Sequence, residues 1–197
     1  PDADYAGAAG FDYTVTDAQG AASTVRATLN VAPVNDAPRL LGETVAAEED
    51  TVVTLTAAQL LANDHDVDGG ALSIVSADNA SHGSVVLQGD GSIVFTPDLN
   101  YNGAATLTYT VSDGVGGLSQ ATVNLNLAAV NDAPSLQADA LSTAENQPLV
   151  VSAATLLAND SDVDGPHAAL QVTAVGNARH GSVSLSGGQV TFTPDAN

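Results

Sequence analysis

The sequence predicts an all-β fold made of tandem immunoglobulin-like, Greek-key β-sandwich repeats of about 96 residues. Three observations lead to this prediction. Short motifs recur along the chain with a nearly constant offset, short segments alternate polar and apolar residues, and turns containing glycine, asparagine or aspartate separate these segments. About seven short strands in a repeat of this length are typical of such a sandwich.

Four recurring motifs define the repeat. They are VNDAP at 34–38 and 130–134, LLANDHDVDG at 60–69 and LLANDSDVDG at 156–165, SHGSV at 81–85 and RHGSV at 179–183, and FTPDLN at 95–100 and FTPDAN at 192–197. We therefore expect the C-terminal part of one repeat at 1–33, a complete repeat at 34–129 and the N-terminal part of a third at 130–197. Since the sequence contains no methionine, we also expect it to be an internal piece of a longer protein.

Each strand of the complete repeat is predicted from its residue pattern. Segments 106–112 and 121–127 alternate polar and apolar residues with the period of a half-buried strand, which places Leu107, Tyr109 and Val111 on one face. The AAQLLAN stretch that follows the second strand is compatible with one helical turn. Five further strands are expected at 40–47, 51–56, 71–76, 83–88 and 92–96.

Composition narrows the possible function classes. The chain carries 23 acidic residues, three arginines and no lysine, which gives a formal net charge of −20. This charge repels phosphate backbones and anionic membrane surfaces, so we expect neither a nucleic-acid partner nor membrane insertion. The absence of cysteine removes disulfides and thiolate metal sites. The charge suits a cation, with a merely solubilising acidic surface as the alternative.

The directions of successive strands place the acidic loops at the two ends of a repeat. We call the end that follows the VNDAP linker the entry end and the opposite end the exit end. The exit end of one repeat faces the entry end of the next, so carboxylates are expected to converge at two junctions. The first junction collects Asp2, Asp4, Asp36, Asp64, Asp66, Asp68 and Asp113. The second collects Glu49, Asp98, Asp132, Asp160, Asp162 and Asp164, beside Asn100 and Asn131.

This concentration of acids predicts a metal site at each junction. Thirteen of the 23 acidic residues lie there, and like charges at this density are costly without a counter-ion. Hard oxygen donors favour Ca²⁺ over transition metals. An EF-hand loop beginning at Asp64 is the alternative, but its twelfth position is Val75 instead of the glutamate that such loops require.

The ordered motifs resemble a known family. YTVSDGVGGLSQATVNLNLAAVNDAP is similar to the end of a cadherin repeat followed by its Asn-Asp linker, and LLANDHDVDGGALSIV resembles the cadherin Asp-x-Asp-x-Gly loop. The order LLAND-x-D-x-DG, HG-x-V, FTP-x-x-N-Y-x-G and VNDAP is closer still to the cadherin-like tandem repeats of giant bacterial surface proteins, including RTX adhesins. The resemblance covers the whole chain.

The resemblance implies Ca²⁺ bound between consecutive repeats of a secreted or bacterial cell-surface protein that acts in cell adhesion and biofilms. The repeats would form a stiff extender that holds a distal binding domain away from the cell. By position, it implies ligand roles for Glu49, Asp98, Asn100, the linker residues Asn35, Asn131 and Asp132, the pair Asp162 and Asp164, and Asp113. The chain departs from the family pattern at Pro33 and Ala129, where cadherin linkers begin with aspartate. It also departs at Asn100, where the acidic pair before the sixth strand of a cadherin repeat ends in glutamate.

The sequence predicts no catalytic activity. It contains no His-x-x-x-His pair, no serine in a G-x-S-x-G context and no glycine-rich phosphate loop, and its acids recur by register instead of gathering in one cleft. His82 and His180 each precede a glycine at matched turns, so we expect a structural role, with metal ligation or pH sensing as the alternative.

Two further expectations concern partners. The alternative to an extender is a repeat that itself binds a carbohydrate, a protein or a like repeat. Residues 1–33 supply two strands of a sandwich and residues 134–197 supply five, which together make the seven of a complete repeat. Besides contacts between neighbouring repeats of one chain, we therefore expect a possible head-to-tail contact between copies through these incomplete terminal repeats.

Overall fold

The computed structural model describes residues 2–196, except for the side chain of residue 168. Pro1 and Asn197, which the repeat register assigns to the first and last repeats, lie outside the described residues. The described residues form two compact units, with the boundary between residues 128 and 129.

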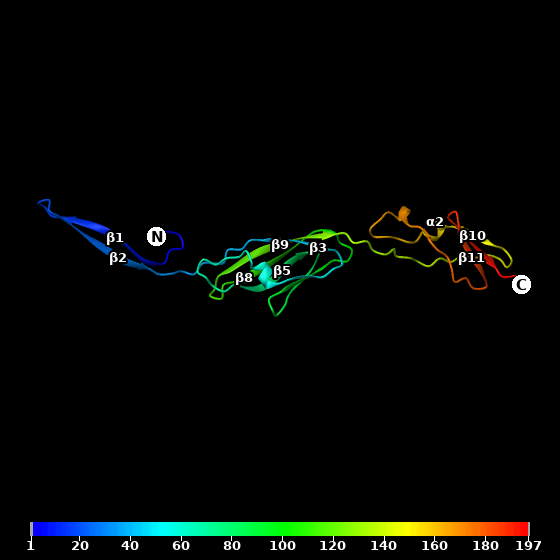
Figure 1. Cartoon of the computed structure of the whole chain (residues 1–197), viewed down its shortest axis with the longest axis horizontal. Coiled ribbons are helices and arrows are strands. Elements are labelled where there is room, and N and C mark those ends of the chain that lie inside the picture. Colours follow the sequence, from blue (N-terminus) through cyan, green and yellow to red (C-terminus); the bar gives the residue numbers. More distant parts are fainter. Residues whose placement is uncertain (1, 197) are drawn as a thin grey trace. The chain divides into compact units, whose positions relative to one another are not determined.

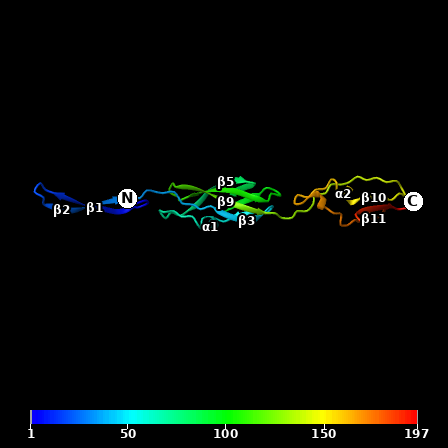
Figure 2. The same cartoon turned by 90° about the horizontal axis from the view of Figure 1, so that it is seen from above.

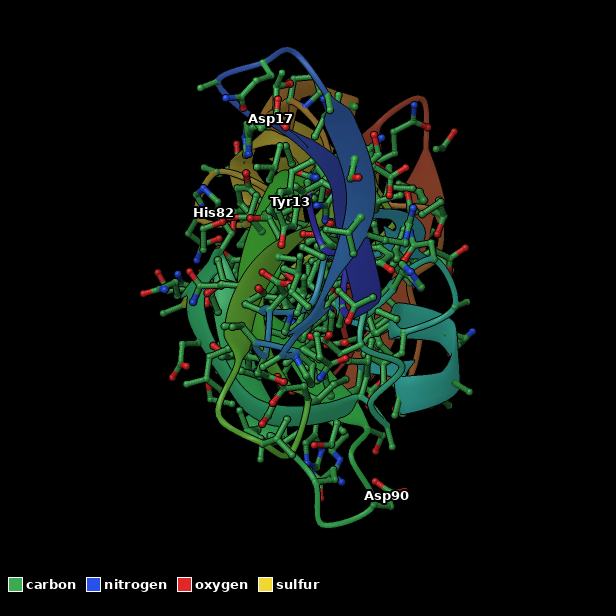
Figure 3. All side chains as sticks on the ribbon, turned by 90° about the vertical axis from the view of Figure 1, so that its left-hand side faces the viewer. Tyr13, Asp17, His82 and Asp90 are labelled. Atoms are coloured by element: carbon green, nitrogen blue, oxygen red, sulfur yellow. The ribbon has the colours of Figure 1, made fainter. Side chains whose placement is uncertain are left out.

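Residues 7–31 form one long β-hairpin. Strand β1 (Gly7–Thr16) pairs with β2 (Ala22–Val31) in an unbroken antiparallel register of ten residue pairs. Asp17 closes the turn between them, because its Oδ1 accepts hydrogen bonds from the amides of Gln19 (3.0 Å) and Ala21 (2.8 Å). Figure 3 shows Asp17 in this turn and Tyr13 on β1.

The central repeat is a two-sheet sandwich with seven strands, coloured cyan to green in Figures 1 and 2. One sheet has the order β3-β9-β8-β5 and the other β4-β7-β6, so the predicted all-β sandwich is confirmed. Strand β3 runs parallel to β9, and the other neighbours are antiparallel. The elements are β3 (Glu43–Glu48), β4 (Val53–Leu55), α1 (Ala57–Leu60), β5 (Ser73–Ser81), β6 (Gly83–Leu87), β7 (Ile93–Pro97), β8 (Gly103–Ser112) and β9 (Leu118–Ala128).

The alternating residues of β8 and β9 supply most of the core between the two sheets. Leu107, Tyr109 and Val111 of β8 are fully buried, as the period-two pattern predicts. They pack with Val123, Leu125 and Leu127 of β9, with Phe95 of β7 and with Leu60 of α1, all of which are buried. This apolar burial is the main force that holds the two sheets together.

Two details of the central repeat follow from local chemistry. The predicted helical turn is α1, which a capping box begins: Thr56 Oγ1 accepts from the amide of Gln59, and the Gln59 side chain accepts from the amide of Thr56. The predicted strand 71–76 instead spans Ser73–Ser81, because irregularities after Ile74 and Asp78 interrupt the alternation on which the prediction depended.

The second unit contains a smaller set of elements. Strands β10 (Leu149–Ser152), β11 (Gly181–Ser186) and β12 (Gln189–Pro194) form one sheet with the order β10-β12-β11. Helix α2 (Ala153–Leu156) and the 3₁₀ turn η1 (His167–Ala169) lie between β10 and β11 in the chain. Segments 139–144 and 171–179, which match β3 and β5 in the repeat register, do not form strands.

Candidate metal centre

The linker and the Asp-x-Asp loop are fastened together at the entry end of the central repeat. Arg39 and His65 exchange backbone hydrogen bonds of 2.7 and 3.0 Å. The amide of Asp36 donates to Asp68 Oδ2 at 2.7 Å. These bonds hold the acidic loop beside the linker, as the strand directions predict.

Asp66 is the least satisfied carboxylate of this loop. Its Oδ1 accepts a hydrogen bond from the amide of Asp68 at 2.8 Å, which gives the loop its tight turn. Its Oδ2 is buried and has no hydrogen-bond partner, and the residue is only 4% exposed. A buried carboxylate oxygen without a donor is costly, and a bound cation would remove that cost.

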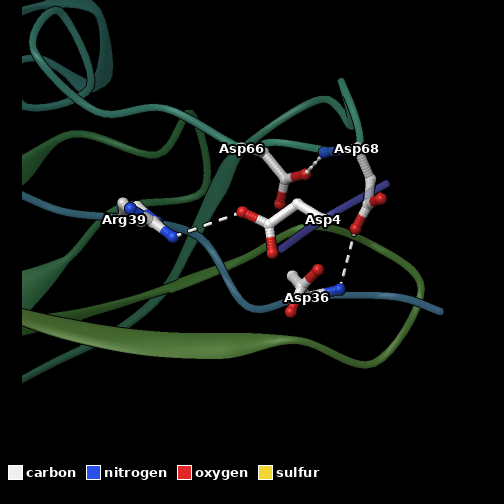
Figure 4. A network of polar contacts seen from close by, with 5 residues as sticks. All are labelled: Asp4, Asp36, Arg39, Asp66 and Asp68. Carbon is white, nitrogen blue, oxygen red and sulfur yellow. Dashed lines mark hydrogen bonds and ion pairs between the residues drawn. The ribbon is translucent and has the colours of Figure 1, made fainter. Parts of the chain in front are cut away.

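A cavity lies between the end of the hairpin and this loop. It has a volume of about 280 Å³, and its lining includes four carboxylates, from Asp2, Asp4, Asp36 and Asp68. Figure 4 shows Asp4 beside Asp36, Asp66 and Asp68, with the Arg39 guanidinium 3.5 Å from the Asp4 carboxylate. Most of the acids predicted at the first junction therefore lie around one cavity, and one of the three arginines of the chain lies beside them.

Asp113 occupies the same end of the repeat but already has several donors. Asn35 Nδ2 donates to its Oδ2 at 2.7 Å, and the amides of Val115, Gly116 and Gly117 donate to its Oδ1. The Asn35 side chain and these amides lower the pKa of the Asp113 carboxyl, so it stays ionised. An anionic Asp113 remains suited to a cation.

Asp64, also predicted at the first junction, is held by groups of its own repeat. Its Oδ1 accepts from the amide of Leu41 at 3.0 Å, and its Oδ2 lies 3.5 Å from the hydroxyl of buried Tyr109. That hydroxyl also donates toward Glu43 at 3.0 Å, and toward the carbonyl of Leu60 at 3.3 Å. Burial raises the pKa of Glu43 and of Tyr109. The spacing of the aspartates in the sequence does not distinguish this structural role of Asp64 from the role of a metal ligand.

The exit end of the central repeat gathers residues from two loops. Glu49 is 1% exposed, and its Oε2 accepts from Asn102 Nδ2 at 3.4 Å. Asp50 Oδ1 accepts from the amide of Asn100 at 2.8 Å. The backbone amide of Asp98 donates to the carbonyl of His82, and this bond fixes the position of Asp98. Asp50 and Asn102 were not among the predicted site residues. Asp50 directly follows the predicted residue Glu49, and Asn102 lies two positions after the predicted residue Asn100.

The second unit repeats the entry-end arrangement. The amide of Asp132 donates to Asp164 Oδ2, and the amide of Asp164 donates to Asp162 Oδ1 at 2.9 Å. Asp160 Oδ1 accepts from the amide of Gln137 at 2.8 Å, as Asp64 does from Leu41. A cavity of about 190 Å³ is lined by Asn131, Asp162 and Asp164 among others. The local geometry of the loop thus follows from its sequence.

The His-Gly motif has a structural explanation. His82 adopts a left-handed backbone with φ of 54°, and its ring stacks on Tyr101 with centroids 3.9 Å apart. A Cβ at Gly83 would lie 2.5 Å from the carbonyl oxygen of Thr96 and 2.6 Å from the ring of Phe95, so only glycine fits. His180 and Gly181 repeat the same backbone and the same close approach.

In the described part of the chain, no three aspartate, glutamate or histidine side chains are arranged so that they could hold a metal ion as they stand. The residues at the first junction nevertheless fit a hard cation. Their side chains offer oxygen ligands, four of their carboxylates line a shared cavity, and Asp66, in the same loop as Asp68, has a buried oxygen with no donor. In the part of the chain that the structure describes, residues 2–196, no helix is long and apolar enough to cross a membrane.

Comparisons with known proteins are consistent with this architecture. The family model described as "Cadherin-like domain" matches residues 34–128 and 130–197. No curated protein sequence matches the chain. Structures similar to this chain include protocadherin gamma B7 domains 1–4, with 16% identity, a TM-score of 0.45 and coverage of 96% of this chain and 49% of that one.

Two further solved structures show the range of the likeness. The human desmocollin-1 ectodomain is 13% identical, with a TM-score of 0.40 and coverage of 90% of this chain and 34% of its own. An endo-fucoidan hydrolase of glycoside hydrolase family 107 is 15% identical, with a TM-score of 0.38 and coverage of 99% and 30%. This chain thus spans from under a third to about half of the length of the three structures. Likenesses at these TM-scores do not indicate a shared activity.

Proposed function

Because this chain belongs to the cadherin-like domain family, we propose that it is part of the extender of a bacterial surface adhesin, in which Ca²⁺ bound between consecutive repeats stiffens the chain. The extender would project a distal binding domain from the cell, and its location would be the cell surface or the secreted space. In this proposal the repeats carry no catalytic activity. Their boundaries lie at 33/34 and 129/130.

One observation supports the metal part of this proposal most directly. The buried, partnerless Oδ2 of Asp66 belongs to a loop whose neighbour Asp68 lines a cavity with three other carboxylates. Without a cation, these negative charges repel one another and one oxygen stays unsatisfied. A divalent ion would neutralise the repulsion and fill the unsatisfied position.

The residues that would hold Ca²⁺ at the first junction are the four acids that line this cavity together with Asp66 and Asp113 of the same end of the repeat. Asp2 and Asp4 come from the segment before β1, and Asp36, Asp66, Asp68 and Asp113 come from the central repeat, with Asn35 as a neutral neighbour. At the second junction the corresponding proposed residues are Glu49, Asp98, Asn100, Asn131, Asp132, Asp162 and Asp164. Asp64 and Asp160 would support the loop through their backbone bonds.

The aromatic residues of the central repeat favour an extender over a repeat that itself binds a ligand. Tyr109 is fully buried, and Tyr101 stacks on His82 while its hydroxyl donates to the carbonyl of Ala104 at 2.9 Å. Both rings are thus engaged in the framework of the repeat. Exposed, unengaged aromatic rings would be expected at a sugar-binding surface.

Calorimetric titration of the chain with Ca²⁺, after chelator treatment, tests the proposal. We expect saturable binding in the range of about 10⁻⁴–10⁻³ M that is typical of extracellular modules, and much weaker binding of Mg²⁺. Replacing both Asp66 and Asp68 with asparagine should greatly reduce binding at the first junction and leave binding at the second junction in place. A Ca²⁺ concentration of about 10 mM is about 100 times a dissociation constant of 10⁻⁴ M. Identical melting curves in chelator and at this Ca²⁺ concentration would contradict the proposal.

A further inference from the structure

The hairpin β1–β2 presents an apolar face that its counterpart in the central repeat buries. The repeat register matches Phe11, Tyr13 and Val15 of β1 with Leu107, Tyr109 and Val111 of β8. Tyr13 is 47% exposed and Phe11 59%, whereas Tyr109 and Leu107 are completely buried. The opposite face of the hairpin is polar, with a Thr14–Thr24 hydrogen bond between hydroxyls. One face of this hairpin is therefore made to be covered.

The second unit contains a cavity with the matching lining. It has a volume of about 350 Å³, and its walls include Asp139, Leu156 and Asp160. In the repeat register these residues correspond to Glu43, Leu60 and Asp64.

In the central repeat, these three residues are the hydrogen-bond partners of the buried Tyr109 hydroxyl. The cavity of the second unit is thus lined by the positions that would receive a tyrosine at the place of Tyr109. Tyr13 is the residue of the hairpin that occupies this place in the register.

The edges of the two parts are also complementary. In the central repeat, β3 pairs with β9 and β5 pairs with β8. Segments 139–144 and 171–179 of the second unit correspond to β3 and β5 in the repeat register, but neither segment forms a strand. Strands form along a hydrogen-bonding partner, and a hairpin of the β8–β9 type supplies two such edges.

From this match we infer that the hairpin of one copy of this chain docks into the second unit of another copy, with the Tyr13 hydroxyl beside Asp139 and Asp160. The segment between Val31 and Asn35 spans at most about 14 Å, so the open end of the hairpin stays beside the entry end of its own central repeat. A second copy has no such tether. Any further repeat in a longer chain would offer its own hairpin to the same cavity and compete with it.

Such docking joins unlike surfaces and therefore builds a head-to-tail series. In sedimentation velocity runs on the 197-residue chain, we expect the average mass to rise with concentration above 19.5 kDa. Hydrogen exchange should show amide protection of segments 139–144 and 171–179 that increases with concentration. Neither expectation depends on Ca²⁺ binding, so a failure here is distinguishable from a failure of the proposed function.

Two variants test the two surfaces separately. Tyr13→Ala should disrupt the apolar face of the hairpin, and Leu156→Arg should block the cavity of the second unit. Each variant alone should therefore stay monomeric. Thr14→Ala on the polar face of the hairpin and Ala154→Arg on an exposed position of α2 are the matched controls, and both should associate as the parent does. Circular dichroism of each variant should retain the β signal of the parent.

An equimolar mixture of the two variants is the decisive measurement. The Leu156→Arg chain still carries an intact hairpin and the Tyr13→Ala chain an intact cavity, so the mixture should form a dimer of twice 19.5 kDa and nothing larger. A parent chain that stays monomeric at every concentration would overturn the inference. So would a mixture that yields no dimer, or a Tyr13→Ala variant that associates as strongly as Thr14→Ala.

Discussion

Replacing Asp66 with asparagine should change stability in opposite directions without and with Ca²⁺. The residue is 4% exposed, one of its oxygens has no donor, and Asp68 follows two positions later. In chelator, Asp66→Asn removes a buried negative charge and keeps an oxygen for the amide of Asp68. A buried unsatisfied group costs about 1–3 kcal/mol, and more when charged, so we expect the variant to gain about 1 kcal/mol.

In saturating Ca²⁺ the same variant should be less stable than the parent. A ligand at 100 times its dissociation constant stabilises the folded state by about 2.7 kcal/mol. Loss of an anionic ligand removes most of this contribution, which exceeds the gain in chelator. Urea unfolding in chelator and in about 10 mM Ca²⁺ measures both differences in the free energy of unfolding. This Ca²⁺ concentration is about 100 times a dissociation constant of 10⁻⁴ M.

Asp78→Asn is the matched control, because it makes the same charge change at an exposed position of β5. It should change stability by less than about 0.5 kcal/mol in both conditions. The reasoning is refuted if Asp66→Asn shifts stability in the same direction in chelator and in Ca²⁺, or if it is indistinguishable from the control.

Three other predictions follow from the central repeat. Arg39→Ser removes the cation beside Asp4 and should tighten Ca²⁺ binding in calorimetric titration, because the guanidinium opposes a second positive charge; unchanged affinity would show that the ion pair has no influence. Gly83→Ala should destabilise the repeat by about 1–3 kcal/mol in urea unfolding, whereas Gly89→Ala, whose Cβ meets nothing within 4 Å, should be nearly neutral. Burial raises the folded-state pKa of Glu43 above 4.5, so its contribution to stability is present below pH 4.5 and is lost as the pH rises through the folded value. In chelator, Glu43→Gln should therefore gain stability relative to the parent across that range, and a pH-independent difference would contradict this.

The strands were predictable because their signal is local. The alternation along 106–112 and 121–127 is visible in the sequence, and the structure buries the expected face of both segments. The third strand was predicted too short, since the bulges in Ser73–Ser81 depend on its pairing with β8, which the segment itself does not encode.

The candidate site was predictable only as a set of loops. Repeat register and strand direction brought Asp36 and Asp68 to the same end of the repeat, where the structure joins them. The different surroundings of Asp64 and Asp66, two positions apart, could not be predicted. They depend on Tyr109, which is 45 residues from Asp64 in sequence and reaches it only when the two sheets pack.

The parallel pairing of β3 with β9 determines how the central repeat would respond to tension. The chain enters the repeat just before β3 and leaves it directly after β9, and the six residue pairs between Glu43↔Val123 and Glu48↔Ala128 lie side by side in one direction. A pull on the two ends of the repeat would draw the start of β3 and the end of β9 apart. The hydrogen bonds between them would be loaded in shear and share the force, instead of breaking one after another as in a peeled hairpin.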